Sequence, residues 1–230
     1  MPAASLEHDL WVFGYGSLMW RPDFPYEERV AATVAGYHRA FCIASTVHRG
    51  NRERPGLVLG LDRGRTCVGI AYRIATRNAA SVLAYLRERE LVYGVYRETL
   101  VTAKLASGAS VETAQVLAYT IERCHPAYTG QLPLVTQAAV IRGARGHAGA
   151  NLDYLINTVH HLRELGIRER EIERLLAISA GYAANGANGV MHRPSVRGMC
   201  TTWARLPAKL PRLPLGDQRR FGHRIATTRS

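Results

Sequence analysis

Short apolar runs bounded by turn-forming residues fill the first half of the chain and predict β-strands. The segment 62–65 (Asp-Arg-Gly-Arg) is typical of a turn, so the apolar residues on either side of it are interpreted as two separate strands. The expected strands cover residues 10–15, 30–43, 56–61, 66–74, 96–105 and 111–121.

Helical spacing of apolar residues occurs once between these strands and again after the last of them. The first expected helix covers 78–91, with Thr76 as its N-cap. Gly166 stands where glycine commonly ends a helix. The other expected helices cover 134–144, 151–165 and 168–180. Strands followed by helices predict an α+β domain with a mixed sheet, not an alternating β/α fold.

Composition divides the 230 residues into a folded body and a basic appendage. The body, 10–180, is large enough to bury a core without a metal or a disulfide. Residues 181–204 are rich in Gly, Ala and Asn, which is typical of a linker. Residues 205–230 hold three prolines and seven basic residues against one acidic residue, which predicts a disordered basic tail.

The formal net charge of +12 would attract nucleic acid, anionic membranes and small anionic substrates. Only the composition of the tail favours nucleic acid, because the tryptophans lack the spacing of a base-stacking surface. No apolar run reaches the ~18–20 residues of a membrane-spanning helix, and the N-terminal residues do not form a secretory signal. The four cysteines are scattered, as in reduced proteins, so we expect a cytoplasmic protein without a membrane partner.

One glutamate interrupts the apolar face of the first expected helix. On a wheel of about 100° per residue with Val82 at zero, the apolar stripe includes Leu86 near 40°, and Glu90 falls near 80°, inside that stripe. Glu88 falls near 240° on the same wheel, on the opposite face. Burying an ionised carboxylate is costly. Glu90 is therefore either paired with an arginine at a frayed helix end or a general acid or base tuned by burial.

A segment with two glycines around a tyrosine follows the first expected strand, within residues 13–20 (Phe-Gly-Tyr-Gly-Ser-Leu-Met-Trp). Such a turn can aim successive backbone N–H groups at a carboxylate or a developing oxyanion. A plain strand-to-loop turn is the alternative. The segment is neither a P-loop nor a dinucleotide fingerprint, because no Gly-Lys-Ser/Thr follows it and position 19 is methionine.

Further short segments complete a pattern in which order and spacing matter more than any single piece. They are residues 11–20, 22–24, 36–37 with 39 and 41, 45–46, 48–50, 55–56, 69–72, 85–86, 89–90, 94–96, 128 with 130 and 133, 149–151 and 153–155. Over about residues 10–178 the chain resembles the ChaC-like family of glutathione-specific γ-glutamylcyclotransferases.

The resemblance implies a small mixed β-barrel flanked by helices and an enzyme that cyclises the γ-glutamyl group of glutathione to 5-oxoproline, releasing Cys-Gly. Glu90 would be the catalytic acid and base, and no metal or cofactor would be needed. Ser17 would belong to the substrate loop and would not be a nucleophile. The loop that would cradle the γ-glutamyl group consists of Gly14, Tyr15, Gly16, Ser17, Leu18 and Met19.

Several alternatives stay open from the sequence. If the protein is an enzyme, its substrate is glutathione or another γ-glutamyl amine. If it is not an enzyme, it is a basic binding or regulatory protein that uses its tail. Arg49, next to His48, either pairs with a glutathione carboxylate or fixes a loop. Tyr128 either donates into the pocket or packs in the core. His160 and His161 are expected to be surface residues without a carboxylate nearby.

Overall fold

The computed structural model describes residues 9–107 and 110–181. These residues belong to the first of two compact units, Met1–Val190 and Met191–Ser230. The predicted linker, beyond its first residue, and the predicted basic tail lie outside the described residues, so the division of the chain into 10–180, 181–204 and 205–230 stays a prediction. None of the described helices is long and apolar enough to cross a membrane.

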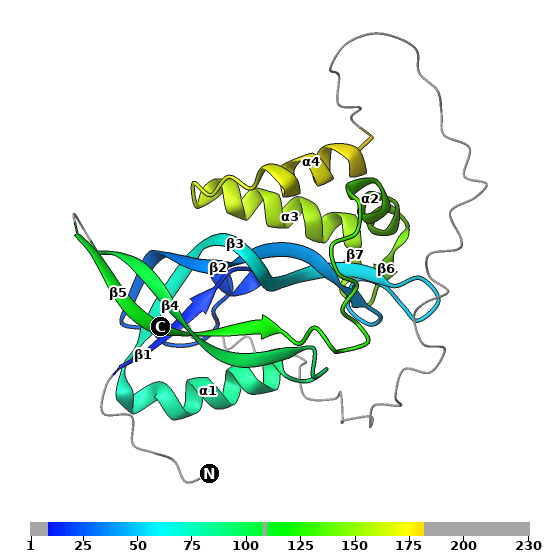
Figure 1. Ribbon diagram of the computed structural model, residues 1–230. Coiled ribbons are helices and arrows are strands. Elements are labelled where there is room, and N and C mark those ends of the chain that lie inside the picture. Colours follow the sequence, from blue (N-terminus) through cyan, green and yellow to red (C-terminus); the bar gives the residue numbers. More distant parts are fainter. Residues whose placement is uncertain (1–8, 108–109, 182–230) are drawn as a thin grey trace, which may run out of the picture. The chain divides into compact units, whose positions relative to one another are not determined.

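Five strands close into a barrel in the order β1-β3-β2-β4-β5 (Figure 1). Strand β5 runs parallel to β1 and β3, whereas the other neighbours are antiparallel, so the sheet is mixed as predicted. The strands are β1 (Leu10–Gly14), β2 (Glu28–Ser45), β3 (Gly56–Ile74), β4 (Tyr96–Ser107) and β5 (Ser110–Ile121).

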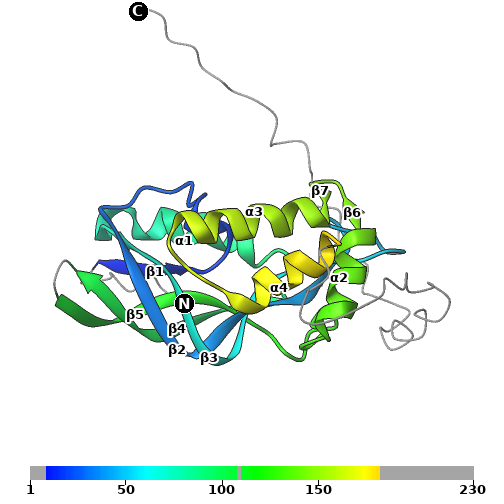
Figure 2. The ribbon, with the colours of Figure 1, turned by 90° about the horizontal axis from the view of Figure 1, so that it is seen from above.

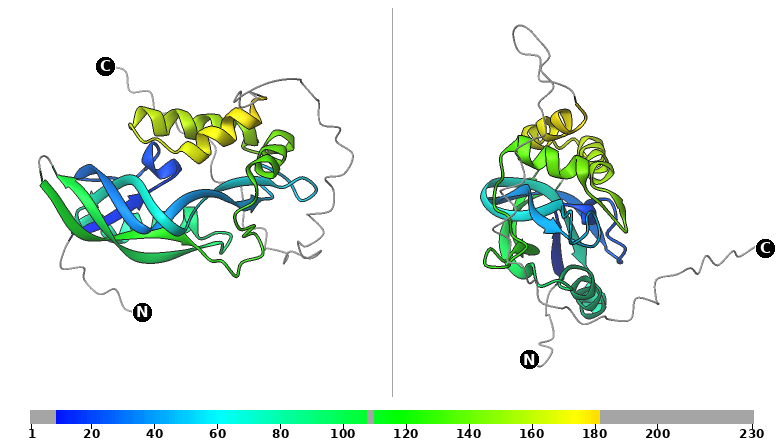
Figure 3. Two further views of the ribbon diagram at one scale, coloured as in Figure 1. Left: turned by 45° about the horizontal axis from the view of Figure 1, so that its top comes forward. Right: turned by 90° about the vertical axis from the view of Figure 1, so that its right-hand side faces the viewer.

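The helices cover two opposite sides of the barrel, as the side view in Figure 3 shows. Helix α1 lies on one side (Figure 1), and α2, α3 and α4 lie together over the other (Figure 2). A hairpin that the sequence pattern does not predict, β6 (Arg145–Gly146) and β7 (Gly149–Ala150), joins α2 to α3. The helices are α1 (Thr76–Glu90), α2 (Leu134–Gly143), α3 (Asn151–Glu164) and α4 (Arg170–Ser179). The predicted α+β barrel with flanking helices is confirmed.

Of the three core clusters, the largest joins strands to helices and the second is made mainly of strand residues. Adjacent residues of β1 belong to different clusters: Phe13 packs in the strand cluster, and Val12 packs with helix residues such as Leu86. This alternation follows from the two-residue period of a strand. Tyr15, which follows β1, still belongs to the strand cluster, so the barrel interior reaches the predicted substrate loop.

The predicted turn at 62–65 is wrong, because these residues lie inside the continuous strand β3. Both halves of β3 pair with β2, with Asp62 opposite His38 and Arg63 opposite Tyr37. The side chain of Asp62 is buried and accepts hydrogen bonds from Tyr128 and Arg123, at 2.8 and 2.7 Å. Distant partners therefore hold a turn-like sequence in a strand.

The predicted N-cap of the first helix is also wrong. Helix α1 begins at Thr76 itself, and Ala75 occupies the N-cap position without a side-chain hydrogen bond. The Asp9 carboxylate replaces that cap by accepting a hydrogen bond from the Thr76 N–H at 3.1 Å. Gly166 has a positive φ of 70° two residues after α3 ends, which agrees with its predicted role in ending that helix.

Candidate active site

The predicted substrate loop, called here the 14–19 loop, begins at Gly14, the last residue of β1. It ends with a short 3-10 helix, Ser17–Met19. A side chain at its first position would crowd the turn, since a Cβ on Gly14 would lie 3.1 Å from the Cβ of Leu18 and 3.2 Å from its carbonyl carbon. The chain therefore turns back on itself directly after the strand, which brings the backbone of Tyr15 to Leu18 to one end of the barrel.

Every carbonyl oxygen from Tyr15 to Met19 accepts a hydrogen bond. The Gly16 and Ser17 carbonyls accept from N–H groups of residues 19–21. The Leu18 and Met19 carbonyls accept from the Tyr72 hydroxyl at 3.0 and 2.9 Å. The remaining carbonyl, that of Tyr15, accepts from an arginine side chain of β2.

The N–H groups of the same loop, unlike its carbonyls, are mostly not hydrogen-bonded within the described residues. The first N–H bonded inside the 3-10 helix is that of Met19, so the turn leaves the earlier N–H groups without an intrahelical acceptor. For Gly16, Ser17 and Leu18, no backbone or side-chain acceptor is found within the part of the chain that the structure describes. A loop with its carbonyls occupied and its N–H groups available suits a carboxylate or an oxyanion.

Glu90 lies on the buried side of α1, as the helical wheel predicts. Val82 and Leu86 are buried, and the Glu90 side chain is only 18% exposed, whereas Glu88 is exposed on the other face. Burial raises the pKa of the Glu90 carboxyl, and the charge and hydrogen bond of Arg89 partly oppose this effect. A carboxylate with a raised pKa is a better proton acceptor than a solvated one.

Four tyrosine side chains share this environment with Glu90. Burial raises the pKa of each of them, and the charge of Glu90 adds to the effect in all four. Two of their hydroxyls are held by backbone: Tyr15 donates to the Tyr119 carbonyl at 3.0 Å, and Tyr96 donates to the Leu59 carbonyl at 2.6 Å. The four are Tyr15, Tyr96, Tyr119 and Tyr154.

Arg89 connects Glu90 to the 14–19 loop. Its Nη2 donates to Ser17 Oγ at 3.0 Å, and its Nε lies 3.2 Å from Glu90 Oε1. Its Nη1 donates to the Tyr85 hydroxyl and to the Arg21 carbonyl, both at 2.8 Å. The guanidinium therefore binds both predicted parts of the site at once, although they are more than 70 residues apart in the sequence.

The whole body of the chain matches one known family. A family model described as ChaC-like protein matches residues 10–180.

The chain belongs to the ChaC-like family.

Curated relatives of this ChaC-like chain, from a bacterium and from an animal, are both named glutathione-specific γ-glutamylcyclotransferases. The glutathione-specific γ-glutamylcyclotransferase of Escherichia coli (strain K12) is 33% identical over 186 residues, which cover 80% of this chain and 79% of that protein. The glutathione-specific γ-glutamylcyclotransferase 1 of Homo sapiens is 37% identical over 171 residues, which cover 74% of this chain and 76% of that protein.

The fold of the ChaC-like chain is also similar to a solved structure. The crystal structure of a γ-glutamyl cyclotransferase specific to glutathione from yeast gives a TM-score of 0.69 at 22% identity. The match covers 79% of this chain and 100% of the yeast chain. At this identity the match shows that the two proteins share a fold.

The segments that carry the resemblance contain Arg89, Tyr96 and Tyr154, but the sequence assigns these side chains no role in the site. Arg89 is next to Glu90 in the sequence, but its contact with Ser17 depends on the fold. Nothing local marks Tyr96 and Tyr154 as neighbours of Glu90, since they come from β4 and α3. In the ChaC-like chain, strand ends and two helices contribute these groups to one place.

Two open alternatives have structural contacts of their own. Arg49 donates to the Ala148 carbonyl at 2.6 Å, and its guanidinium lies 5.1 Å from the centre of the Tyr154 ring, which supports the loop-fixing interpretation. The Tyr128 hydroxyl donates its hydrogen bond to Asp62, so in this structure it does not donate into a pocket. Both side chains therefore act within the protein framework in this structure.

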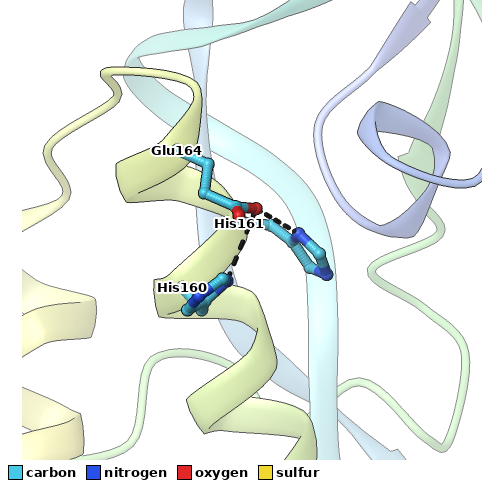
Figure 4. A group of neighbouring side chains, drawn as sticks. All are labelled: His160, His161 and Glu164. Carbon is cyan, nitrogen blue, oxygen red and sulfur yellow. Dashed lines mark hydrogen bonds and ion pairs between the residues drawn. The ribbon is translucent and has the colours of Figure 1, made fainter.

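The expectation that no carboxylate lies near His160 and His161 is wrong. Glu164, one helical turn further on, contacts both imidazoles: its Oε2 lies 3.4 Å from His160 Nδ1 and 2.9 Å from His161 Nδ1 (Figure 4). His161 also stacks on Trp20, with ring centroids 4.5 Å apart. His160, His161 and Glu164 offer possible metal-ligand atoms within 4.8 Å of one another, but His160 and Glu164 are exposed.

A separate cavity of about 310 Å³ lies between β2, the 131–133 segment, α2 and α4. Phe41, Leu132, Gln137 and Leu175 are among its lining residues. Neither Glu90 nor any residue of the 14–19 loop lines it, so the groups described above form a different part of the molecule.

Proposed function

We propose that this protein is a glutathione-specific γ-glutamylcyclotransferase, which converts glutathione to 5-oxoproline and Cys-Gly. The names of its relatives support the substrate and the reaction. The structural observation that supports the proposal most strongly is the buried Glu90 carboxylate, joined through Arg89 to a loop with available N–H groups.

The reaction begins with a proton transfer. The α-ammonium group of the γ-glutamyl moiety cannot attack while it is protonated, so the Glu90 carboxylate accepts one of its protons. The free amine then attacks the γ-carbonyl carbon of the same moiety and closes a five-membered ring. Since nucleophile and electrophile belong to one molecule, the protein supplies orientation and proton transfer.

Ring closure turns the γ-carbonyl oxygen into an oxyanion. The N–H groups of the 14–19 loop bind this oxygen, in the way that preorganised donors stabilise tetrahedral intermediates. The intermediate then collapses as the protonated Glu90 donates its proton to the departing cysteinyl nitrogen. The C–N bond to cysteine breaks, the ring nitrogen loses its second proton to the amino group of the departing dipeptide, and the products are 5-oxoproline and Cys-Gly. Water is not consumed.

The substrate can be tested directly with the full chain. We expect 5-oxoproline from glutathione, followed by mass spectrometry, and little from γ-glutamyl amines with other leaving groups. Release from another γ-glutamyl amine only would transfer the same chemistry to that substrate. A folded protein that releases none from any of these compounds would favour the alternative of a basic binding protein.

Removing the Ser17 hydroxyl should have a modest effect. Ser17 accepts a hydrogen bond from Arg89 and, in this mechanism, forms no covalent bond with substrate. One hydrogen bond is worth about 1 kcal/mol, so we expect Ser17→Ala to lower kcat by no more than about tenfold. Steady-state kinetics measure this. A complete loss, together with an acyl-enzyme mass in wild type, would instead make Ser17 a nucleophile.

The pH profile should respond to Arg89. Activity rises as pH increases through the pKa of Glu90, because the ionised carboxylate is the base. Arg89 lowers this pKa against the effect of burial, so Arg89→Met leaves burial less opposed and raises it. We therefore expect the acidic limb of kcat/KM to move to higher pH. The four tyrosines that face Glu90 are unchanged by this substitution.

A matched control is available on the same helix. Arg87 is two residues earlier, and its exposed guanidinium pairs with Glu98 at 2.8 Å. Arg87→Met should leave the acidic limb in place. If Arg89→Met also left it unmoved, or moved it to lower pH, Arg89 would not be the charge that tunes Glu90.

A further inference from the structure

Arg39 is a fully buried cation next to the 14–19 loop. Its side chain, on β2, is 0% exposed. Burial of a charge is costly unless it is paired and hydrogen-bonded. Arg39 meets this condition with three nitrogens that point to three different partners.

The contacts of Arg39 connect three elements. Its Nε donates to the Tyr15 carbonyl, and its Nη1 pairs with the Glu169 carboxylate just before α4. Its Nη2 donates to the Val68 carbonyl of β3 at 2.7 Å and lies 3.7 Å from the sulfur of Met19. The carboxylate balances the charge, so the bond to Tyr15 is made by a compensated but still cationic group.

The Tyr15 carbonyl and the Gly16 N–H belong to one peptide unit. This unit is planar, and its C=O and N–H point in opposite directions. Holding the carbonyl on Arg39 therefore fixes the direction of the Gly16 N–H, which points away from Arg39. A cation on the carbonyl oxygen also polarises the amide, because hydrogen bonds in series strengthen one another.

The Gly16 N–H is one of the three loop N–H groups for which no acceptor is found in the described chain. Gly16 has no side chain that could anchor the peptide before it, so a partner from elsewhere in the chain must hold that peptide. Arg39 is the side chain that holds the oxygen of that peptide.

We propose that Arg39 is a positioning residue: it orients and polarises the Tyr15–Gly16 peptide so that the Gly16 N–H stabilises the oxyanion formed on ring closure. The proposal rests on the proposed function. Arg39 does not touch the substrate in this account. Its effect reaches the reaction through one backbone amide, so it should appear in kcat more than in KM.

Arg39→Lys is the informative substitution. Lysine keeps the positive charge but has one nitrogen, so it cannot reproduce bonds from Nε, Nη1 and Nη2 to separate partners. Losing a whole oxyanion donor costs about 10²–10³ in kcat. A mis-oriented donor should cost less, so we expect kcat to fall about 10- to 100-fold with KM changed less than about threefold.

The Gly16 amide gives a second readout that does not depend on turnover. Its nitrogen resonance in a ¹⁵N-labelled full chain should move upfield in Arg39→Lys, because the carbonyl of the preceding residue loses its cationic partner. Arg73→Lys is the control. Like Arg39, Arg73 is an ion-paired arginine of the barrel, with Asp9 and Glu28 as its partners, but its side chain is 34% exposed. It should change neither kcat nor the Gly16 resonance.

An unchanged kcat in Arg39→Lys would overturn the proposal, as would a fall in kcat with the Gly16 resonance unmoved. If Arg39→Lys does not fold, Glu169→Gln decides, because it leaves the Arg39–Tyr15 bond in place. With its balancing carboxylate gone, Arg39 should polarise the Tyr15 carbonyl more strongly, so a downfield shift of the Gly16 nitrogen with at least about a third of kcat supports the proposal. An unmoved or upfield resonance would contradict it, since Arg39 would then not act on that peptide.

Failure of the proposed function would look different. In that case the wild-type chain would release no 5-oxoproline from any γ-glutamyl compound, and there would be no oxyanion for the Gly16 N–H to stabilise. The Gly16 resonance would still report whether Arg39 holds the Tyr15–Gly16 peptide.

Discussion

Glu90→Gln is expected to lower kcat for 5-oxoproline release by about 10²–10⁴-fold, the usual contribution of one positioned proton-transfer group. Glutamine has nearly the same shape as glutamate but cannot accept the ammonium proton or return it to the leaving nitrogen. The mechanism uses Glu90 in both steps, so no other group replaces it. Rates with saturating glutathione measure the effect.

The fold should survive this substitution. Burial raises the pKa of Glu90, so the folded protein is penalised for the charged form, and a neutral amide removes that penalty. Glu88→Gln is the matched control, because Glu88 is exposed on the opposite face of α1. It should keep full activity. Full activity in a folded Glu90→Gln protein would show that the carboxylate is not the acid and base.

Asn151→Ala is expected to cause a large loss of stability. Asn151, the first residue of α3, is completely buried. Its Oδ1 accepts from the Leu57 N–H at 2.6 Å, and its Nδ2 donates to the Leu57 carbonyl at 2.7 Å. The side chain thus satisfies both backbone groups of one β3 residue. Alanine would leave both buried and unpaired.

An unsatisfied buried polar group costs about 1–3 kcal/mol, so the two together should lower the free energy of unfolding by about 2–6 kcal/mol. Urea denaturation measures this as a lower midpoint with an unchanged m-value. Gln115→Ala is the control, since its amide hydrogen bond to Thr102 is on the exposed surface of the barrel. If the two substitutions cost the same, Asn151 would not join α3 to the barrel in the way described.

Local patterns predict much of this fold because they reflect local physics. The strands of the barrel follow from apolar runs, and the buried position of Glu90 follows from its angle on the helix relative to Val82 and Leu86. The site needed the resemblance as well: a Gly-Tyr-Gly segment by itself does not distinguish a plain turn from a loop with available N–H groups.

Two of the errors have the same physical cause, which is contact between residues that are distant in the sequence. The sequence at 62–65 would suit a turn, but Asp62 is bonded to Arg123, which lies 61 positions further along the chain. Thr76 has the side chain of an N-cap, but the carboxylate of Asp9, 67 positions earlier, accepts the hydrogen bond from its N–H. The carboxylate of Glu164 differs, because its spacing of four from His160 could have been recognised in the sequence.

Isotope labelling of the product tests the central claim most directly. Wild-type protein is incubated with glutathione in H₂¹⁸O, and the products are weighed by mass spectrometry. Intramolecular cyclisation predicts 5-oxoproline and Cys-Gly without ¹⁸O, because water takes no part in the bond changes. Glutamate carrying one ¹⁸O would mean that water attacks the γ-carbonyl, which would contradict cyclisation and the role given to the substrate's own amine.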